Sequence, residues 1–340
     1  MDVGIFTMFT VREGSSQFDA FEEWFRLIQQ AESQGIDTFW IGESHFRPER
    51  AVMASPLVGA SAVAARTERM KIGLAVQVLP LANPLRMAEE TAIVDHISKG
   101  RLIVGVGRSS FLESYQGYNI DYSESRERFA ESLDVLLQAW RKDTFSYQGE
   151  FYKFHNVQLV PKTYQKPHPP IRIAVESRDT FTLAGRLGFP IFIRHQMSVP
   201  ELQHLLSEYR DARASAGFHG SNDVILQIGG YVANTSQEAI EDPKESSMHR
   251  IRVIQDNLDK AADQETYERL KASSSVTYED LLQKVAFGTP EAVIGKIKQY
   301  QNDLGITGIS FDINPGGQIP FSKVSKSLQL LTQKVMPFLK

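Results

Sequence analysis

The chain has 340 residues, of which 42% are apolar and 23% charged, and this ordinary globular composition argues against intrinsic disorder. Its 37 basic and 41 acidic side chains give a formal charge of −4, which argues against a basic platform for nucleic acid. The chain contains no cysteine, so disulfides, thiolate nucleophiles and cysteine-ligated metal sites are excluded.

The first residues do not resemble a targeting signal. Asp2 stands where a secretion signal carries Lys or Arg. The longest apolar stretch, from Ile72 to Ala82, is interrupted by Gln77 and Pro80. It is far shorter than the roughly 20 residues that cross a bilayer. We therefore expect a cytoplasmic protein that makes no contact with a membrane.

Eight short β-rich runs alternate with amphipathic helical patterns along almost the whole chain. Several of these runs are continuously apolar, which is typical of strands buried on both faces of a parallel sheet. The alternation predicts a (β/α)8 TIM barrel, and a doubly wound open sheet is the alternative. The predicted strands are Val3–Thr7, Thr38–Gly42, Lys71–Leu79, Leu102–Gly107, Ile171–Val175, Pro190–Arg194, Val224–Ala233 and Gly308–Ile313.

Three segments between the predicted elements are longer than a barrel requires, because a barrel of this type takes roughly 250 residues. These segments are 109–121, 141–170 and 235–289. We therefore predict a single domain over residues 1–340 with insertions after the fourth and the seventh strand. Two alternating runs around Gln148-Gly149 predict a β-hairpin in the second segment. The third segment is polar and charged, which predicts a mobile, partly helical lid.

The segment that follows the fifth predicted strand has the composition of an anion site. Ser177, Asp179 and Thr180 are residue types that cap helix N-termini, where free N–H groups and the helix dipole attract a phosphate. Arg108, at the end of the fourth strand, can add a bidentate contact, and Arg126 begins the next helix on the same side. The alternative is plain helix capping beside surface arginines.

Two other motifs are less specific. The Gly105-x-Gly107 pair lies on the fourth strand, lacks a third glycine and opens no helix, so it does not fit a dinucleotide-binding loop. His45, directly after the second strand, is either a general acid or base or a structural partner of a nearby carboxylate. No spacing of His, Asp and Glu predicts a metal site.

The segment from Ser55 to Ser109, SPLVGASAVAARTERMKIGLAVQVLPLANPLRMAEETAIVDHISKGRLIVGVGRS, resembles the bacterial luciferase-like flavin monooxygenases. The similarity continues through GESHF, SRERFAESLDVLLQAW and VESRDTFTLAGRLG to the final SLQLLTQKVMPFL, and is weakest over 235–289. This resemblance implies a TIM-barrel oxidoreductase. Such an enzyme binds reduced FMN (FMNH2), activates O2 and inserts one oxygen atom into a small organic substrate.

The resemblance also implies roles for individual residues. Leu74-Ala75 matches a non-proline cis peptide beneath the flavin ring, and His195 matches a residue that lines the substrate cavity. The positions that hold the flavin phosphate and the ribityl chain in the family are matched here by Arg108, Arg126, Glu176, Ser177 and Thr180.

One position departs from the family pattern. Ser44 stands where the family has its catalytic histidine, and His45 is the second histidine of that pair. A serine hydroxyl can donate a hydrogen bond to the flavin but is not a strong base. In the family, the second histidine reaches across a dimer to a glutamate that is matched here by Glu89. Ser44 and His45 are therefore the catalytic candidates, and His45 is also a candidate interface residue.

The chain has no nicotinamide-binding motif, so we expect a separate NAD(P)H-dependent flavin reductase as a partner. We also expect a homodimer, or a heterodimer with a homologous subunit. Two alternatives remain within this resemblance. One is an F420-dependent oxidoreductase of the same fold. The other is a flavin-binding, luciferase-like subunit without its own turnover, because the non-catalytic luciferase subunit also lacks the first histidine.

Overall fold

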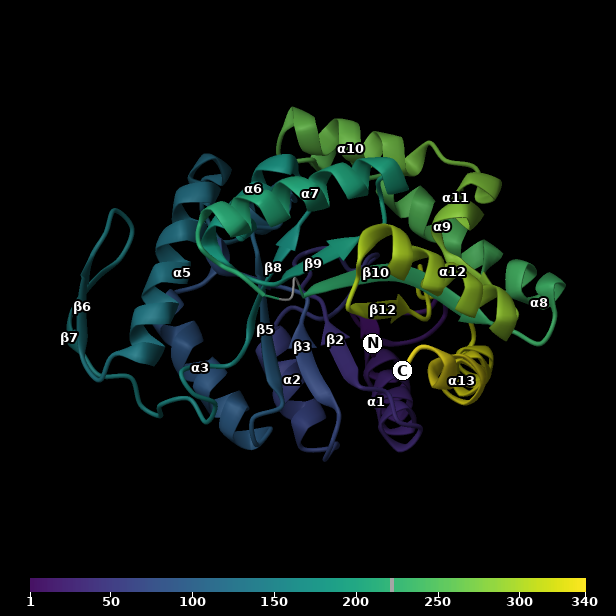
Figure 1. The fold of residues 1–340 in the computed structure, drawn as a ribbon, viewed down its shortest axis with the longest axis horizontal. Coiled ribbons are helices and arrows are strands. Elements are labelled where there is room, and N and C mark those ends of the chain that lie inside the picture. Colours follow the sequence, from purple (N-terminus) through teal and green to yellow (C-terminus); the bar gives the residue numbers. More distant parts are fainter. Residues whose placement is uncertain (221–222) are drawn as a thin grey trace.

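The computed structural model describes residues 1–220 and 223–340, and its centre is a closed ring of eight parallel strands (Figure 1). The ring closes because β12 pairs with both β1 and β10. The predicted barrel is therefore confirmed, and the open-sheet alternative is wrong. In ring order the strands are β1 (Asp2–Thr7), β2 (Thr38–Ile41), β3 (Lys71–Leu74), β5 (Leu102–Gly107), β8 (Ile171–Val175), β9 (Ile191–Arg194), β10 (Val224–Val232) and β12 (Gly308–Asp312).

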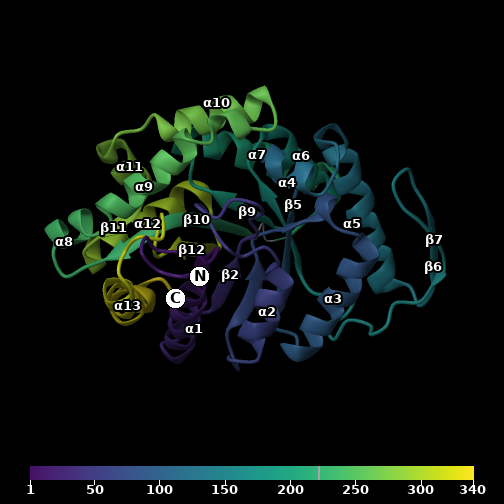
Figure 2. The same ribbon diagram turned by 180° about the vertical axis from the view of Figure 1, so that it is seen from behind.

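Helices surround this ring in both views (Figures 1 and 2). Their apolar side chains recur every three or four residues and face inward, as Phe129, Leu136 and Trp140 do in α5. The expected helical patterns are thereby confirmed. The surrounding helices are α1 (Gln17–Ser33), α2 (Pro56–Ala64), α3 (Pro84–Ile97), α5 (Ser125–Arg141), α6 (Arg178–Leu187), α7 (Val199–Ser215), α12 (Pro290–Leu304) and α13 (Phe321–Leu330). Within residues 1–220 and 223–340, no helix combines the length and apolar composition needed to cross a membrane.

The third barrel strand is interrupted. We predicted one strand over Lys71–Leu79, but the chain leaves the sheet after Leu74 and pairs with β5 again only at β4 (Gln77–Val78). The cis peptide bond in this interruption joins Ala75 to Val76, so the predicted position, Leu74-Ala75, is wrong by one residue. Leu74 still pairs with Ile41 of β2 and is fully buried, so its backbone belongs to the regular strand.

The two glycines of β5 leave space for this interruption. A Cβ atom at Gly105 would lie 1.9 Å from the carbonyl oxygen of Leu74. A Cβ atom at Gly107 would lie 2.6 Å from Cγ2 of Val76. The Gly-x-Gly pair therefore allows two neighbouring strands to approach closely, which is a general use of glycine in strands.

The three predicted insertions differ in form. Segment 109–121 contains the short helix α4 (Leu112–Gly117). Segment 141–170 forms the predicted hairpin from β6 (Phe145–Gln148) and β7 (Lys153–Val157), which projects beyond α5 (Figure 1). Segment 235–289 is more helical than expected and adds one short strand to β10. It comprises α8 (Ser236–Glu241), α9 (Lys244–Gln255), α10 (Gln264–Ser274), α11 (Tyr278–Lys284) and β11 (Ala286–Gly288).

Candidate active site

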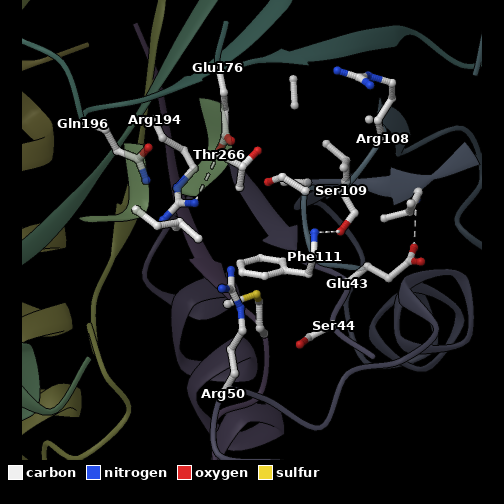
Figure 3. Close-up of a pocket in the computed structure, with 18 of the residues that line it drawn as sticks. Glu43, Ser44, Arg50, Arg108, Ser109, Phe111, Glu176, Arg194, Gln196 and Thr266 are labelled. Atoms are coloured by element: carbon white, nitrogen blue, oxygen red, sulfur yellow. Dashed lines mark hydrogen bonds and ion pairs between the residues drawn. The ribbon is translucent and has the colours of Figure 1, made fainter. Parts of the chain in front are cut away.

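A cavity of about 360 Å³ lies at the carboxyl ends of the barrel strands, the usual position of active sites in this fold. Side chains from the ends of β2, β5, β8 and β9 form its base and sides, and α9 and α10 contribute another wall. Glu43 and Ser44 lie on one side of the cavity, and Glu176, Arg194 and Gln196 lie on the other (Figure 3). The third insertion therefore helps to enclose the site.

Most of the predicted site residues meet at this cavity. The two that do not line it are Leu74, which is buried in the barrel wall, and His195. The predicted residues that line it are Ser44, His45, Ala75, Arg108, Arg126, Glu176, Ser177 and Thr180.

One end of the cavity is formed by the N-terminus of α6. Ser177 is the N-cap residue, and its backbone N–H donates to Thr180 Oγ1 at 3.2 Å. The Thr180 hydroxyl in turn donates to the carbonyl oxygen of Ser177 at 2.7 Å. This cap is encoded locally by the Ser-x-x-Thr spacing, and it directs free backbone N–H groups and the positive end of the helix dipole toward the cavity.

Two arginines stand beside this helix end. Arg108 donates from Nη1 to Ser125 Oγ at 3.1 Å, and Ser125 is the first residue of α5. Arg126 Nη1 lies 3.1 Å from Asp179 Oδ2, which connects the first turns of α5 and α6. Two helix N-termini and two guanidinium groups therefore converge on one end of the cavity. This is a set of donors that suits a phosphate.

Glu176 differs from the role that the resemblance implied, because its carboxylate is already engaged. It forms ion pairs with Arg269 and, at 3.4 Å, with Arg194 Nη1. Burial acts to raise the pKa of this carboxyl, but the charges of Arg269 and Arg194 outweigh burial and hold the pKa below its usual range. Its side chain therefore positions arginines, and its backbone N–H donates to Thr180 Oγ1 at 3.3 Å.

His45 is enclosed within the chain. Its Nε2 lies 2.6 Å from Glu43 Oε1, and its Nδ1 lies 3.3 Å from the Tyr118 hydroxyl. Glu43 also accepts a hydrogen bond from the backbone N–H of Val78 at 3.0 Å. Burial raises the pKa of the Glu43 carboxyl, and the bond to His45 opposes that shift. His45 therefore makes the bond to a neighbouring carboxylate that its structural alternative describes.

His195 was predicted to line the substrate cavity, and this prediction is wrong. Successive side chains of a strand point to opposite faces, so Arg194 and Gln196 face the cavity while His195 faces α12. Its ring lies 4.8 Å from that of Tyr300, and neither ring nitrogen has a hydrogen-bond partner among the described residues. Burial, together with the charges of Lys296 and Lys284, lowers the pKa of His195 to about 4.

This depressed pKa predicts an acid-sensitive contribution to stability. In the unfolded chain the imidazole protonates near pH 6.5, whereas in the folded chain it stays neutral down to about pH 4. Between these values the unfolded state binds more protons, so acidification lowers the free energy of unfolding. The His195→Leu variant lacks this group. Between pH 6.5 and 4, the free energy of unfolding of the variant should therefore fall by about 2 kcal/mol less than that of the native protein. Urea titrations at both pH values measure the difference, and equal losses would contradict the assignment.

Several cavity residues could not be identified from the sequence. Arg50 follows the GESHF motif at the end of β2, and its HFRPER context is the one local signal that was available. Arg250 and Arg269 come from α9 and α10, where no motif marks them. In the part of the chain that the structure describes, no group of three or more His, Asp or Glu side chains is arranged to hold a metal ion.

A closed barrel with a cavity at the carboxyl ends of its strands is the architecture of a TIM-barrel enzyme. A family model described as luciferase-like monooxygenase matches residues 1–307. The chain therefore belongs to the luciferase-like monooxygenase family, a family of oxidoreductases, as the resemblance implied.

Two relatives match over nearly the whole chain. An alkanal monooxygenase alpha chain from Photorhabdus laumondii is 25% identical, covering 96% of this chain and 94% of the relative. The oxygenase component of a flavin-dependent trigonelline monooxygenase from Acinetobacter baylyi is 23% identical, covering 96% and 92%.

Solved structures show the same fold. The monooxygenase RslO1 from Streptomyces bottropensis has a TM-score of 0.87 and 27% identity, with full coverage of both chains. The oxygenating constituent of 3,6-diketocamphane monooxygenase from Pseudomonas putida, in complex with FMN, has a TM-score of 0.85 at 18% identity and covers 99% of this chain and 98% of its own. An F420-dependent secondary alcohol dehydrogenase has a TM-score of 0.76 at 17% identity, covering 100% and 99%. At these two lower identities the likeness concerns the fold alone.

Proposed function

We propose that this protein is the oxygenase component of a two-component system. In this proposal it receives FMNH2 from a separate NAD(P)H-dependent flavin reductase in the cytoplasm and uses O2 to add one oxygen atom to a small organic substrate. The observation that carries the proposal is the convergence of Arg108, Arg126 and the N-termini of α5 and α6 on one end of the cavity. A flavin mononucleotide ends in a phosphate dianion, and this donor set fits that group.

When bound, the flavin would supply the redox chemistry and the reaction with O2. The chain's own residues would bind and orient the flavin and exclude water. Ala75 and Val76 give the cavity a small apolar surface beside the barrel mouth. Ser44 lines the cavity after the end of β2, the strand next to β3, and we assign its hydroxyl a hydrogen bond to the flavin ring.

We assign His45 a positioning role. Its Nε2 and the Glu43 carboxylate are bonded to each other, and Glu43 also holds the backbone of Val78, so this pair connects the loop that carries Ser44 to β4. A buried hydrogen-bonded pair of this kind rigidifies its surroundings and supports the position of Ser44.

The separate reductase follows from two observations. The sequence has no nicotinamide-binding motif, and the trigonelline relative is named an oxygenase component. In a system of this kind, the reduced flavin is made on one protein and used on another. Tight NAD(P)H binding with direct hydride transfer to FMN on the purified protein would contradict this part of the proposal.

The proposal is tested with the purified protein and two cofactors. FMN and F420 are titrated separately, and the loaded, chemically reduced protein is mixed with O2 in an oxygen electrode. We expect FMN to bind, O2 to be consumed, and an oxygen atom from ¹⁸O2 to appear in the product of a substrate screen. Preferential binding of F420 would favour the dehydrogenase alternative. Binding of FMN with no O2 consumption would favour a flavin-binding subunit without turnover.

We also propose that α2 and α3 form the contact surface of a homodimer, or of a heterodimer with a homologous subunit. Their outer faces expose three apolar side chains: Val58 at 70%, Ile93 at 45% and Ile97 at 42%. Ile93 and Ile97 are one helical turn apart on α3, and exposed apolar side chains that lie together in this way mark interaction sites. Glu89 lies on the same helix, α3, and is half-buried.

Glu89→Ala is therefore expected to weaken self-association by about tenfold or more, because it removes a charged partner from the contact surface. Sedimentation velocity over a range of concentrations measures the effect. Glu22→Ala, on the exposed surface of α1, is the matched control and should leave the profile unchanged. An unchanged profile for both variants would count against this surface.

A further inference from the structure

Besides Arg108 and Arg126, five arginines line the cavity. Arg47 is paired with Glu49 and Glu113, and we refer to the other four, Arg50, Arg194, Arg250 and Arg269, as the arginine cluster. They come from four separate elements: the loop after β2, the end of β9, α9 and α10. Figure 3 shows the guanidinium groups of Arg50 and Arg194 directed toward each other beside the ring of Phe111, well apart from Arg108.

Two carboxylates form ion pairs with members of the arginine cluster. Glu176 pairs with Arg269 and, at 3.4 Å, with Arg194. Asp312 lies 3.5 Å from Arg250 Nη1. The guanidinium group of Arg50 lies 4.7 Å from the centre of the Phe111 ring and has no ion pair among the described residues. The cluster therefore carries an excess of positive charge.

The surroundings do not remove this excess. Burial and the neighbouring charges of Arg194, Arg47 and Arg250 lower the pKa of Arg50 to about 9, so it remains protonated at neutral pH. Burial raises the pKa of Asp312, which weakens the one carboxylate that faces Arg250. Enclosed cations that lack a counter-charge are costly, so a ligand that brings a negative charge stabilises this arrangement.

The flavin phosphate does not account for this excess, because Arg108, Arg126 and the α6 N-terminus already form a separate donor set for it. Between the two ends the cavity is largely apolar, lined by side chains such as Phe6, Met8, Val76, Phe111 and Leu270. A ligand that fits here has an apolar body and one anionic group. The planar fork of a guanidinium matches a carboxylate by two parallel hydrogen bonds.

We infer that the substrate is an organic carboxylate whose anionic group binds between Arg50, Arg194 and Arg250, with its apolar body directed toward Val76. This inference rests on the proposed function for the reaction, but the binding of the acid can be measured independently of it.

The test compares carboxylic acids with their primary amides, which have nearly the same shape but no charge. The probes are benzoate and benzamide, 2-naphthoate and 2-naphthamide, and octanoate and octanamide. Isothermal titration at pH 7 is carried out on the protein with and without FMN. We expect at least one acid to bind about tenfold more tightly than its amide. We expect Arg50→Gln to abolish that preference while the affinity for FMN changes by less than about twofold.

Two further variants locate the bound acid. Arg26→Gln, on the exposed face of α1, should keep the preference for the acid. Arg126→Gln should weaken FMN binding and also keep the preference, because Arg126 belongs to the phosphate end. Loss of the preference in Arg126→Gln but not in Arg50→Gln would place the acid at the phosphate end and overturn the inference.

Thermal unfolding supplies a second readout. Because Arg50 lacks a counter-charge, Arg50→Gln should raise the melting temperature of the ligand-free protein, and the preferred acid should raise that of the native protein only. A lower melting temperature for Arg50→Gln, or equal binding of acid and amide in every pair, would overturn the inference. Failure of FMN binding or of O2 consumption would instead refute the proposed function. The comparison of acids with amides would still test whether the cavity binds a carboxylate.

Discussion

Gly105→Ala is expected to lower the free energy of unfolding by about 3 kcal/mol or more, the upper end of the usual cost of overpacking. The added Cβ atom would lie 1.9 Å from the carbonyl oxygen of Leu74, and both atoms belong to neighbouring barrel strands that cannot move apart without breaking the ring. Urea denaturation followed by tryptophan fluorescence measures the loss as a shift of the midpoint at constant slope.

Gly295→Ala is the matched control for this substitution. Gly295 lies inside α12, and no atom lies within 4 Å of the position its Cβ atom would take. Alanine is the better helix former by about 0.5 to 1 kcal/mol, so this variant should be as stable as the native protein or more stable. Equal stability of Gly105→Ala and the native protein would mean that β3 and β5 do not approach as closely as described.

Arg108→Ala is expected to weaken FMN binding by about 1.5 to 3 kcal/mol, which corresponds to the loss of hydrogen bonds to a charged group. The guanidinium of Arg108 bonds to the first residue of α5, so its removal takes a positive charge from the end of the cavity where two helix N-termini meet. Titration of FMN fluorescence with native and variant protein measures the change.

Riboflavin, which lacks the phosphate, separates the contribution of Arg108 from a general disturbance of the site. Arg108→Ala should leave the affinity for riboflavin nearly unchanged. Arg26→Ala, on the exposed face of α1, should leave both affinities unchanged. Unchanged FMN affinity, or an equal loss for FMN and riboflavin, would show that the phosphate binds elsewhere.

The proposed cavity thus has two positively charged ends with an apolar section between them. One end consists of helix N-termini and the arginines beside them, such as Arg126, which pairs with Asp179 and so connects the first turns of α5 and α6. The other end consists of arginines held by carboxylates from distant elements, such as Arg269 and Glu176. A cofactor phosphate and a substrate carboxylate would therefore bind without competing for the same charges.

Much of the barrel could be predicted because its determinants are local. Continuous apolar runs mark buried strands, and apolar residues every three or four positions mark the inner faces of helices such as α5. The cap of α6 is also local, since Ser177 and Thr180 are three residues apart and bond to each other. These features locate strand ends, and with them the end of the barrel where Arg108 and Glu176 lie.

Other features were decided by the tertiary structure alone. Whether Arg194 or His195 faces the cavity depends on how β9 is rotated in the ring, and alternation along a strand does not reveal which face is inside. The break after Leu74 depends on space provided by the glycines of β5, a different strand. Arg250 and Arg269 reach the cavity because α9 and α10 fold over the strand ends, and contacts between residues so distant in sequence leave no periodic pattern in either segment.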